Sequence, residues 1–290
     1  MTDPTIAPEL PSRRPVRSRW WDRRTETLPY PRGPLPPPEG PARVPAHDAL
    51  RCDGQGACER ACPTQAIRLA PDRSGGRGEL TLDYGRCVLC GLCVDACPTG
   101  AMTATSRIEL ATTDRDDLQM VHPLGAGSGP MPAPSSLGPA VRTLVQERFQ
   151  GSLAVRVVDA GSCNGCEVEV QALTWPTYDL ERLGIHIVAS PRHADALLVT
   201  GPVTRAMRHA LTQTWVSMPR PRIVLAVGAC GISGGPFRNS GEVLGGAASV
   251  VPVDVFVPGC PPRPEALLYG FWVALAKAKP RLSRGEYRAI

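Results

Sequence analysis

The chain has 290 residues, 42% of them hydrophobic, and a formal net charge of +5. A chain of this size and hydrophobicity can form one large domain or two ordinary ones, which excludes an intrinsically disordered protein. The positive charge comes mostly from arginine, and few aromatic residues lie among these arginines, so we expect a solvated face and no nucleic-acid partner. The longest apolar stretch, residues 266–276, is too short for a membrane-spanning helix, which needs about 20 residues.

Eleven cysteines are the most informative residues of the chain. The N-terminus carries arginines but no apolar segment of the kind found in export signals, so we expect a cytoplasmic protein. Disulfide bonds are rare in that compartment, and an odd number of cysteines indicates thiolates that bind metal.

The first 108 residues divide into two parts. Residues 1–45 are rich in proline and have only short apolar runs, so we expect an extended docking arm without a core of its own. Residues 46–108 hold seven cysteines in two similar halves, because CPTQAI at Cys62 is echoed by CPTGAM at Cys97. Each half is expected to form a cysteine loop, a short helix and a strand, such as residues 80–83, which predicts a small ferredoxin-like α+β domain.

The second half contains a complete C-x2-C-x2-C-x3-C-P run, by which bacterial ferredoxins hold iron–sulfur clusters. The fourth cysteine of each run in two-cluster ferredoxins ligates the other cluster, so one 4Fe-4S cluster is expected on Cys87, Cys90, Cys93 and Cys62. The first run then supplies the remaining ligands, which are Cys52 and Cys58 together with Cys97. A pair of zinc sites is the alternative, since C-x2-C pairs also bind zinc.

Gln55 occupies the second ligand position of the first run. A neutral amide is a weak ligand for iron compared with a thiolate, so we expect this site to keep three irons as a 3Fe-4S centre. One alternative is an incompletely ligated 4Fe-4S cluster whose fourth iron is bound by water or by an oxygen of Asp53 or Gln55. The other is an empty site.

The pattern changes after an expected linker over residues 109–139, whose second half is rich in Gly, Pro and Ser. Residues 140–149 are expected to form an amphipathic helix. Apolar β-type runs then alternate with helical stretches, which predicts an α/β domain over residues 140–290 with a mostly parallel, flavodoxin-like sheet. The expected strands are residues 153–158, 185–188, 196–199, 223–227 and 253–257.

Four further cysteines follow the carboxyl ends of these strands, where open α/β sheets bind ligands. Cys163 and Cys166 come after the first strand, Cys230 after the fourth and Cys260 after the fifth. Glycines in the segments GSCNGC and GACG let the backbone fold closely over sulfur. We expect one 4Fe-4S cluster on these four thiolates; structural zinc and ordinary buried cysteines are the alternatives.

With both cysteine sets in view, residues 24–275 resemble two subunits of the energy-converting NiFe-hydrogenases of formate hydrogenlyase type, joined in one polypeptide. RTETLPYP and the double cysteine run look like their ferredoxin-like subunit, which has a counterpart in respiratory complex I. GSCNGCEVE, GACG and PGCP look like the hydrogenase small subunit. The complex I relatives, of NADH-quinone oxidoreductase B type, have adjacent cysteines in place of Cys163-x2-Cys166, so the hydrogenases resemble the chain more.

The resemblance implies an oxidoreductase subunit that is not catalytic alone. It would relay electrons between ferredoxin-like clusters and a cluster that faces the active site of a separate hydrogenase-type large subunit. The chain would lie on the inner face of the cell membrane, held there by other subunits of a membrane-anchored complex. Glu169 matches an acidic residue shared by both branches and lies near Glu167, which implies cluster tuning or proton handling; an acid stabilised by a helix N-terminus is the alternative.

Two other functions stay open. The equivalent subunit of a quinone-reducing, complex I-like or nickel-free complex would show the same features, because the nickel or quinone site belongs to the partner. A zinc-stabilised structural scaffold would use the same cysteines without transferring electrons.

Overall fold

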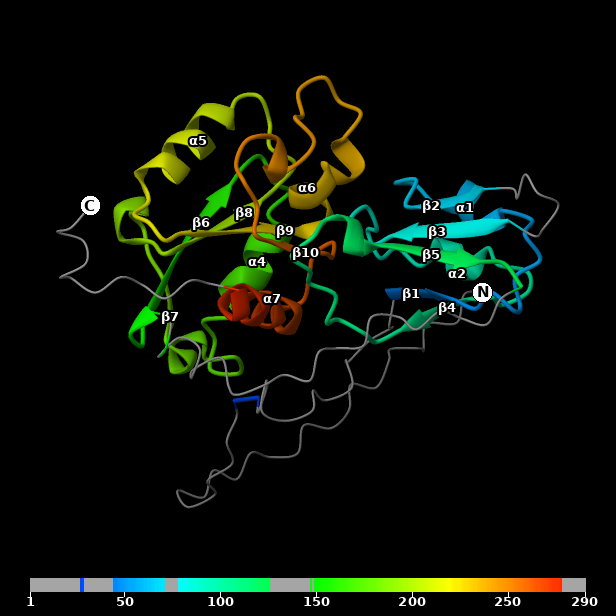
Figure 1. Ribbon diagram of the computed structural model, residues 1–290, viewed down its shortest axis with the longest axis horizontal. Helices are drawn as coiled ribbons and strands as arrows, with labels where there is room; N and C mark the ends of the chain where they lie inside the picture. The colour runs from blue at the N-terminus through cyan, green and yellow to red at the C-terminus, as the bar shows by residue number, and fades with distance from the viewer. Residues whose placement is uncertain (1–26, 29–43, 71–77, 126–146, 148, 278–290) are drawn as a thin grey trace, which may run out of the picture.

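The computed structural model describes residues 27–28, 44–70, 78–125, 147 and 149–277. Two units lie side by side along the longest axis of the molecule, an N-terminal unit of residues 44–125 and a C-terminal unit of residues 149–277 (Figure 1). The first is built from small antiparallel sheets and the second from a parallel sheet with helices, which confirms the predicted fold class.

The N-terminal unit packs two antiparallel sheets around its cysteine loops, with strand orders β1-β4 and β2-β3-β5. Its strands are β1 (Val44–His47), β2 (Ile67–Ala70), β3 (Glu79–Asp83), β4 (Met102–Thr105) and β5 (Gln119–Pro123). Helices α1 (Ala57–Ala61) and α2 (Leu92–Asp95) each begin after a glycine with positive φ, Gly56 and Gly91. Because these helices occupy equivalent places in the two halves, the structure confirms the internal repeat.

The N-terminal unit is longer than the sequence predicts. Residues 109–123, expected in the linker, form the 3-10 helix η1 (Asp116–Leu118) and strand β5, which pairs with β3 along its whole length. Strand β1 also begins inside the expected arm. The reason is that β5 alternates weakly and depends on pairing with β3, which no local pattern reveals.

The C-terminal unit is a five-stranded parallel sheet of order β7-β6-β8-β9-β10, the flavodoxin-like order. Its strands are β6 (Leu153–Asp159), β7 (Ile185–Ile187), β8 (Ala196–Thr200), β9 (Ile223–Val227) and β10 (Val255–Val257). All five predicted strands are therefore present, although β10 begins two residues later than expected. The helix expected over residues 140–149 lies outside the described residues except for positions 147 and 149.

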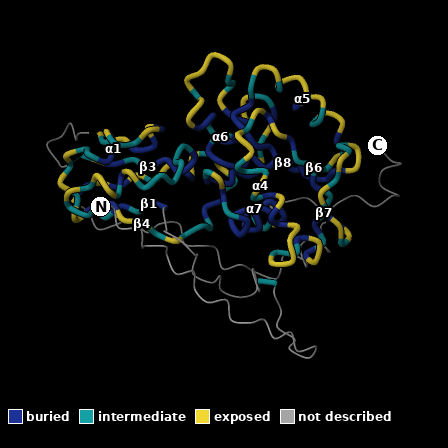
Figure 2. Tube along the Cα trace, turned by 180° about the vertical axis from the view of Figure 1, so that it is seen from behind, coloured by how far each residue is buried: buried dark blue, intermediate teal, exposed yellow. Residues whose placement is uncertain are grey.

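Helices cover both faces of this sheet. They are α4 (Gly165–Ala172), α5 (Arg208–Ser217), α6 (Gly228–Ser233) and α7 (Pro264–Lys277), with 3-10 turns η2 (Leu180–Leu183), η3 (Pro191–His193), η4 (Gly235–Phe237) and η5 (Ala247–Ser249). Side chains of α4 and α7 share one buried cluster with the sheet, and those of α5 and α6 share another. The central strands β8 and β9 are buried throughout, as a parallel sheet covered on both faces requires (Figure 2).

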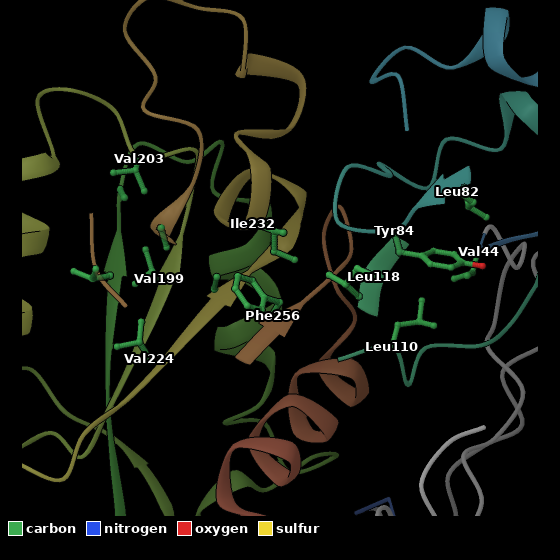
Figure 3. Packing of buried hydrophobic residues seen from close by; sticks show 14 of the residues in the cluster. Val44, Leu82, Tyr84, Leu110, Leu118, Val199, Val203, Val224, Ile232 and Phe256 are labelled. Atoms are coloured by element: carbon green, nitrogen blue, oxygen red, sulfur yellow. The ribbon is translucent and has the colours of Figure 1, made fainter. Parts of the chain in front are cut away.

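The two units share a core. Leu82, Leu110 and Leu118 of the N-terminal unit belong to the same buried cluster as Ile232 and Phe256 of the C-terminal unit (Figure 3). A β-bridge adds residue 112 beside the edge strand β10, with backbone hydrogen bonds of 3.1 and 2.8 Å to residue 256. The relative position of the units is thus fixed by packing and by backbone pairing.

We expect Leu118→Ala to weaken the whole structure, because Leu118 is 2% exposed at this shared core. Removing a buried leucine side chain lowers the free energy of unfolding by about 2–5 kcal/mol. Denaturant titration measures this loss, and Leu50→Ala, at a leucine that is 62% exposed, is the matched control with an effect within about 0.5 kcal/mol. Equal stability of the two variants would show that the shared core contributes little.

Two residues of the expected docking arm are described, and both contact the C-terminal unit. Thr27 Oγ1 donates to the carbonyl of Pro176 at 2.9 Å, and the Leu28 N–H donates to the carbonyl of Thr177 at 2.8 Å. Arg182 donates to the carbonyl of Leu28 at 3.2 Å. Residues 1–26 and 29–43 of the arm lie outside the described residues.

Candidate metal centres

All eleven cysteines are free thiols, and they lie in three groups. The first group surrounds a small cavity near β1 and consists of Cys62, Cys87, Cys90 and Cys93. One member comes from the first half of the repeat and three from the second, which is the grouping that the crossover pattern predicts. Burial, with a contribution from neighbouring thiols, raises the pKa of Cys87 to about 12 and that of Cys93 to about 11.

The second group consists of Cys52, Cys58 and Cys97, which line another small cavity together with His47 and Asp53. Burial raises the pKa of Cys58, and the thiols of Cys52 and Cys97 raise it further. Burial also raises the pKa of Cys97, but hydrogen bonds from backbone N–H groups and from Thr99 outweigh this effect, so the net shift is downward. The first two groups are neighbours, since Cys58 also raises the pKa of Cys93.

Gln55 does not line the cavity of the second group, although its loop has the conformation of a ligand loop. Residues 54 and 56 both have left-handed φ angles, +76° and +71°, and so do the two residues that flank Cys90 in the complete run, Leu89 at 56° and Gly91 at 81°. The exposed Gln55 is held through its backbone: its N–H donates to Asp53 Oδ1 at 3.1 Å, and its carbonyl accepts from Arg60 at 2.8 Å. The first run therefore keeps the ligand loop without the thiol.

The repeat also fixes sulfur atoms in the same way in both halves. Thr64 and Thr99 each lie two residues after a cysteine, and their hydroxyls contact the sulfurs of Cys62 and Cys97 at 3.8 and 3.7 Å. Backbone N–H groups farther along, at residues 66 and 102, donate to the same two sulfurs at 3.2 and 3.4 Å. Such N–H groups stabilise thiolate and sulfide charge.

The third group lies at the carboxyl edge of the parallel sheet and consists of Cys163, Cys166, Cys230 and Cys260. Cys163 is exposed and the other three are partly buried. Burial raises the pKa of Cys166, and charges on Glu167 and on the other three cysteines raise it further. Burial and the neighbouring cysteines also raise the pKa of Cys230, to about 12. The fold therefore brings together four thiols that are far apart in the sequence.

Two glycines leave room for sulfur at this edge. A Cβ atom on Gly228 would lie 2.8 Å from Cys166 Sγ, and a Cβ atom on Gly235 would lie 2.8 Å from Cys230 Sγ. Both glycines also have left-handed φ angles, +80° and +53°. A cradle of glycine around sulfur is what a cluster site requires, because the backbone must approach the thiolates closely. The donor sets and this cradle fit iron–sulfur clusters. Within the described ranges, no group of three or more His, Cys, Asp or Glu side chains is arranged to hold a single metal ion.

Acidic residues lie beside the third group. Thr200 Oγ1 donates a short hydrogen bond to Glu167 Oε1, whereas Glu167 Oε2 is buried with no hydrogen-bond partner among the described residues. Burial and the charge of Glu265 raise the pKa of Glu169. Glu265 is itself 6% exposed and accepts a hydrogen bond from Tyr178 at 3.2 Å. The structure therefore places Glu167 and Glu169 in a partly buried acidic region rather than on a solvated face.

Arg238 connects the third group to the first. Its guanidinium donates to the carbonyl of Thr64 through a short hydrogen bond and to Gln65 Oε1 at 2.7 Å, in the turn that follows Cys62. Ser233 of α6 donates to the carbonyl of Gly85 at 2.9 Å, close to Cys87. A cavity of about 190 Å³ lies between the units, lined by Leu89 and Cys260 among others. The first and third groups therefore face each other across a fixed boundary.

We expect Arg238→Ala to loosen this boundary. Hydrogen bonds from charged groups contribute about 1.5–3 kcal/mol, so the free energy of unfolding should fall by about that amount. Electron exchange between clusters on the first and third groups should also slow, because tunnelling depends steeply on distance. Freeze-quench paramagnetic resonance measures the rate, with Arg208→Ala, an exposed arginine of α5, as control. Unchanged exchange in Arg238→Ala would show that packing alone holds the units.

Several residues of these sites carry no signal in the sequence. His47, Glu265, Tyr178, Thr200 and Arg238 lie far from their neighbours along the chain, and only the fold brings them to the cysteines. The Thr64 and Thr99 contacts could have been inferred, since both threonines belong to the repeated CPT segment.

Comparison with known proteins identifies two family matches. Residues 163–274 match the family described as NADH ubiquinone oxidoreductase, 20 Kd subunit, and residues 51–101 match the 4Fe-4S dicluster domain. The ranges coincide with the third cysteine group and with the first two. Within the part of the chain that the structure describes, no helix has the length and hydrophobicity needed to cross a membrane.

Three curated relatives are similar over roughly the same part of the chain. Formate hydrogenlyase subunit 7 of Escherichia coli is 48% identical over 155 residues, which cover 52% of this chain and 61% of the relative. The probable membrane-bound hydrogenase subunit mbhJ of Pyrococcus furiosus is 49% identical, covering 44% and 77%. The B-type subunit of NADH-quinone oxidoreductase from Carboxydothermus hydrogenoformans is 48% identical, covering 39% and 68%. The match thus spans less than two thirds of the first relative's length.

Proposed function

Because the chain belongs to the family of the 20 kDa subunit of NADH ubiquinone oxidoreductase, we propose that it is an electron-transfer iron–sulfur subunit of a membrane-associated, hydrogenase-type oxidoreductase complex. The observation that carries the proposal is the arrangement of the three cysteine groups in series. The second group neighbours the first through Cys58 and Cys93, and the first faces the third across the boundary held by Arg238. When bound, iron–sulfur clusters supply one-electron transfer.

The residues of the chain hold and separate these centres. Cys87, Cys90, Cys93 and Cys62 would ligate one 4Fe-4S cluster, and Cys163, Cys166, Cys230 and Cys260 another. Cys52, Cys58 and Cys97 would hold a 3Fe-4S centre, because Gln55 presents no thiol and does not line that cavity. The 4Fe-4S dicluster match supports iron rather than zinc in the N-terminal unit.

A separate large subunit would supply the active site and cover the edge of the sheet near Cys163. Exposed apolar side chains next to this cysteine support such an interface: Val168 is 52% and Trp175 is 57% exposed. Other subunits of the complex would hold the chain at the inner face of the membrane, as the names of the hydrogenase relatives suggest for those proteins. Glu167 and Glu169 would then handle protons or tune the cluster at the interface.

A second candidate is the equivalent subunit of a quinone-reducing complex. The 48% identity to the B-type subunit of an NADH-quinone oxidoreductase supports it. The two candidates differ in the partner, which carries either the nickel site or the quinone site.

Purification of the complex from its native host tests both the electron-transfer role and the partner. We expect the chain to co-purify with a large subunit and to show visible thiolate-to-iron absorption that dithionite bleaches. Nickel in the large subunit would favour the hydrogenase, whereas quinone reduction without nickel would favour the second candidate. A colourless, zinc-loaded chain would contradict electron transfer in either complex.

A further inference from the structure

His47 is the one side chain at the second cysteine group whose chemistry the proposed function does not use. It is the last residue of β1, it is 6% exposed, and it lines the cavity formed by Cys52, Cys58 and Cys97. Both of its ring nitrogens are buried and have no hydrogen-bond partner among the described residues. A buried polar group without a partner is unfavourable, so the ring should find one when the site is complete.

The position of His47 in the sheet directs it to one side of the site. It pairs in register with Met102 of β4, and the N–H of Met102 donates to Cys97 Sγ at 3.4 Å. The other aromatic ring at this place is His122, whose ring lies edge-on to that of His47 with centroids 5.1 Å apart. His122 does not line the cavity. The acceptors that remain for His47 are therefore sulfur atoms at the Cys97 side of the cavity.

We propose that His47 donates a hydrogen bond from its ring N–H to a sulfur atom of the centre held by Cys52, Cys58 and Cys97, and that it thereby raises the reduction potential of this centre. The inference rests on the proposed function, because it requires an iron–sulfur centre at these three cysteines. Hydrogen bonds to sulfur stabilise the reduced, more negative form of a cluster, which is one of the main ways a protein sets its potential. His47 acts through sulfur in this proposal and is a positioning and tuning residue.

The test compares His47→Leu with His122→Leu in the full chain, by redox titration followed with paramagnetic resonance. We expect His47→Leu to lower the equilibrium constant for reduction of this centre about tenfold, a shift of about 59 mV to more negative potential. His122→Leu removes an equally buried ring that does not line the cavity, and it should leave the potential unchanged. His47→Asn, which retains an N–H donor, should restore part of the shift.

Nitrogen hyperfine spectroscopy on protein labelled with ¹⁵N-histidine supplies a second readout. A weak coupling in the wild type that His47→Leu abolishes supports the hydrogen bond. A strong coupling would mean that His47 ligates iron directly and would overturn the proposal, as would equal shifts in both leucine variants. Normal iron–sulfur spectra with an unchanged potential in His47→Leu would reject this inference alone, whereas a protein without iron–sulfur spectra would reject the proposed function itself. If His47→Leu fails to fold, the labelling result on the wild type and on His47→Asn decides.

Discussion

Gly228→Ala is expected to eliminate the cluster of the third cysteine group while leaving the two N-terminal centres in place. The added Cβ would lie 2.8 Å from Cys166 Sγ and 3.4 Å from the carbonyl of Gly259, so the sulfur cannot keep its position. Because one of three clusters would be lost, bound iron should fall by roughly one third. Iron analysis and paramagnetic resonance of the reduced protein measure the loss.

Gly245→Ala is the matched control for this variant. Gly245 has a similar left-handed φ angle, +93° against +80° at Gly228, but a Cβ atom there would meet nothing within 4 Å. Both variants carry the backbone strain of an alanine at positive φ, about 1–2 kcal/mol, and only one displaces a sulfur. Full iron content in Gly228→Ala would contradict a cluster at the third group.

Gln55→Cys should convert the centre at Cys52, Cys58 and Cys97 from 3Fe-4S to 4Fe-4S. The loop already has left-handed φ angles at Gly54 and Gly56, as the loop around Cys90 has at its flanking residues, so the new thiol is presented by a ligand-type backbone. The oxidised wild type should show the paramagnetic signal of a 3Fe-4S centre. The substitution should abolish that signal and add one iron per chain.

Gln55→Ala is the control, because it removes the amide without adding a thiol and should keep the 3Fe-4S signal. A wild type without this signal, and with the iron content of three full 4Fe-4S clusters, would mean that a group other than cysteine holds the fourth iron. Asp53, which lines the cavity, is then the first residue to substitute.

The cysteine groups could be predicted from the sequence because cluster ligands follow fixed spacings and strand ends. Cys62 lies with Cys87 and not with Cys52, as the crossover rule of two-cluster ferredoxins requires. Cys230 and Cys260 stand alone in the sequence, and a parallel sheet places them at one edge with Cys163. These predictions succeeded because each depends on local spacing or on strand order.

Other features depend on contacts between distant segments, which local patterns do not encode. Strand β5 has a mixed polar sequence and is stabilised by pairing with β3, so its residues resembled a linker. Arg238 was one arginine among many, and its role follows from the turn at Thr64, which lies 174 positions away. His47 had no ligand spacing, yet the fold buries it at the second group.

The bridge between Thr112 and Phe256 has a consequence for how the protein matures during synthesis. At about 5–20 residues per second, a ribosome needs roughly ten to thirty seconds to travel from one of these residues to the other. During that interval the N-terminal unit is complete, but the strand that covers its boundary does not yet exist. We infer that the first two centres are loaded in this interval, and that ribosome-bound chains ending before Phe256 already carry iron; iron-free stalled chains would place loading after the units have joined.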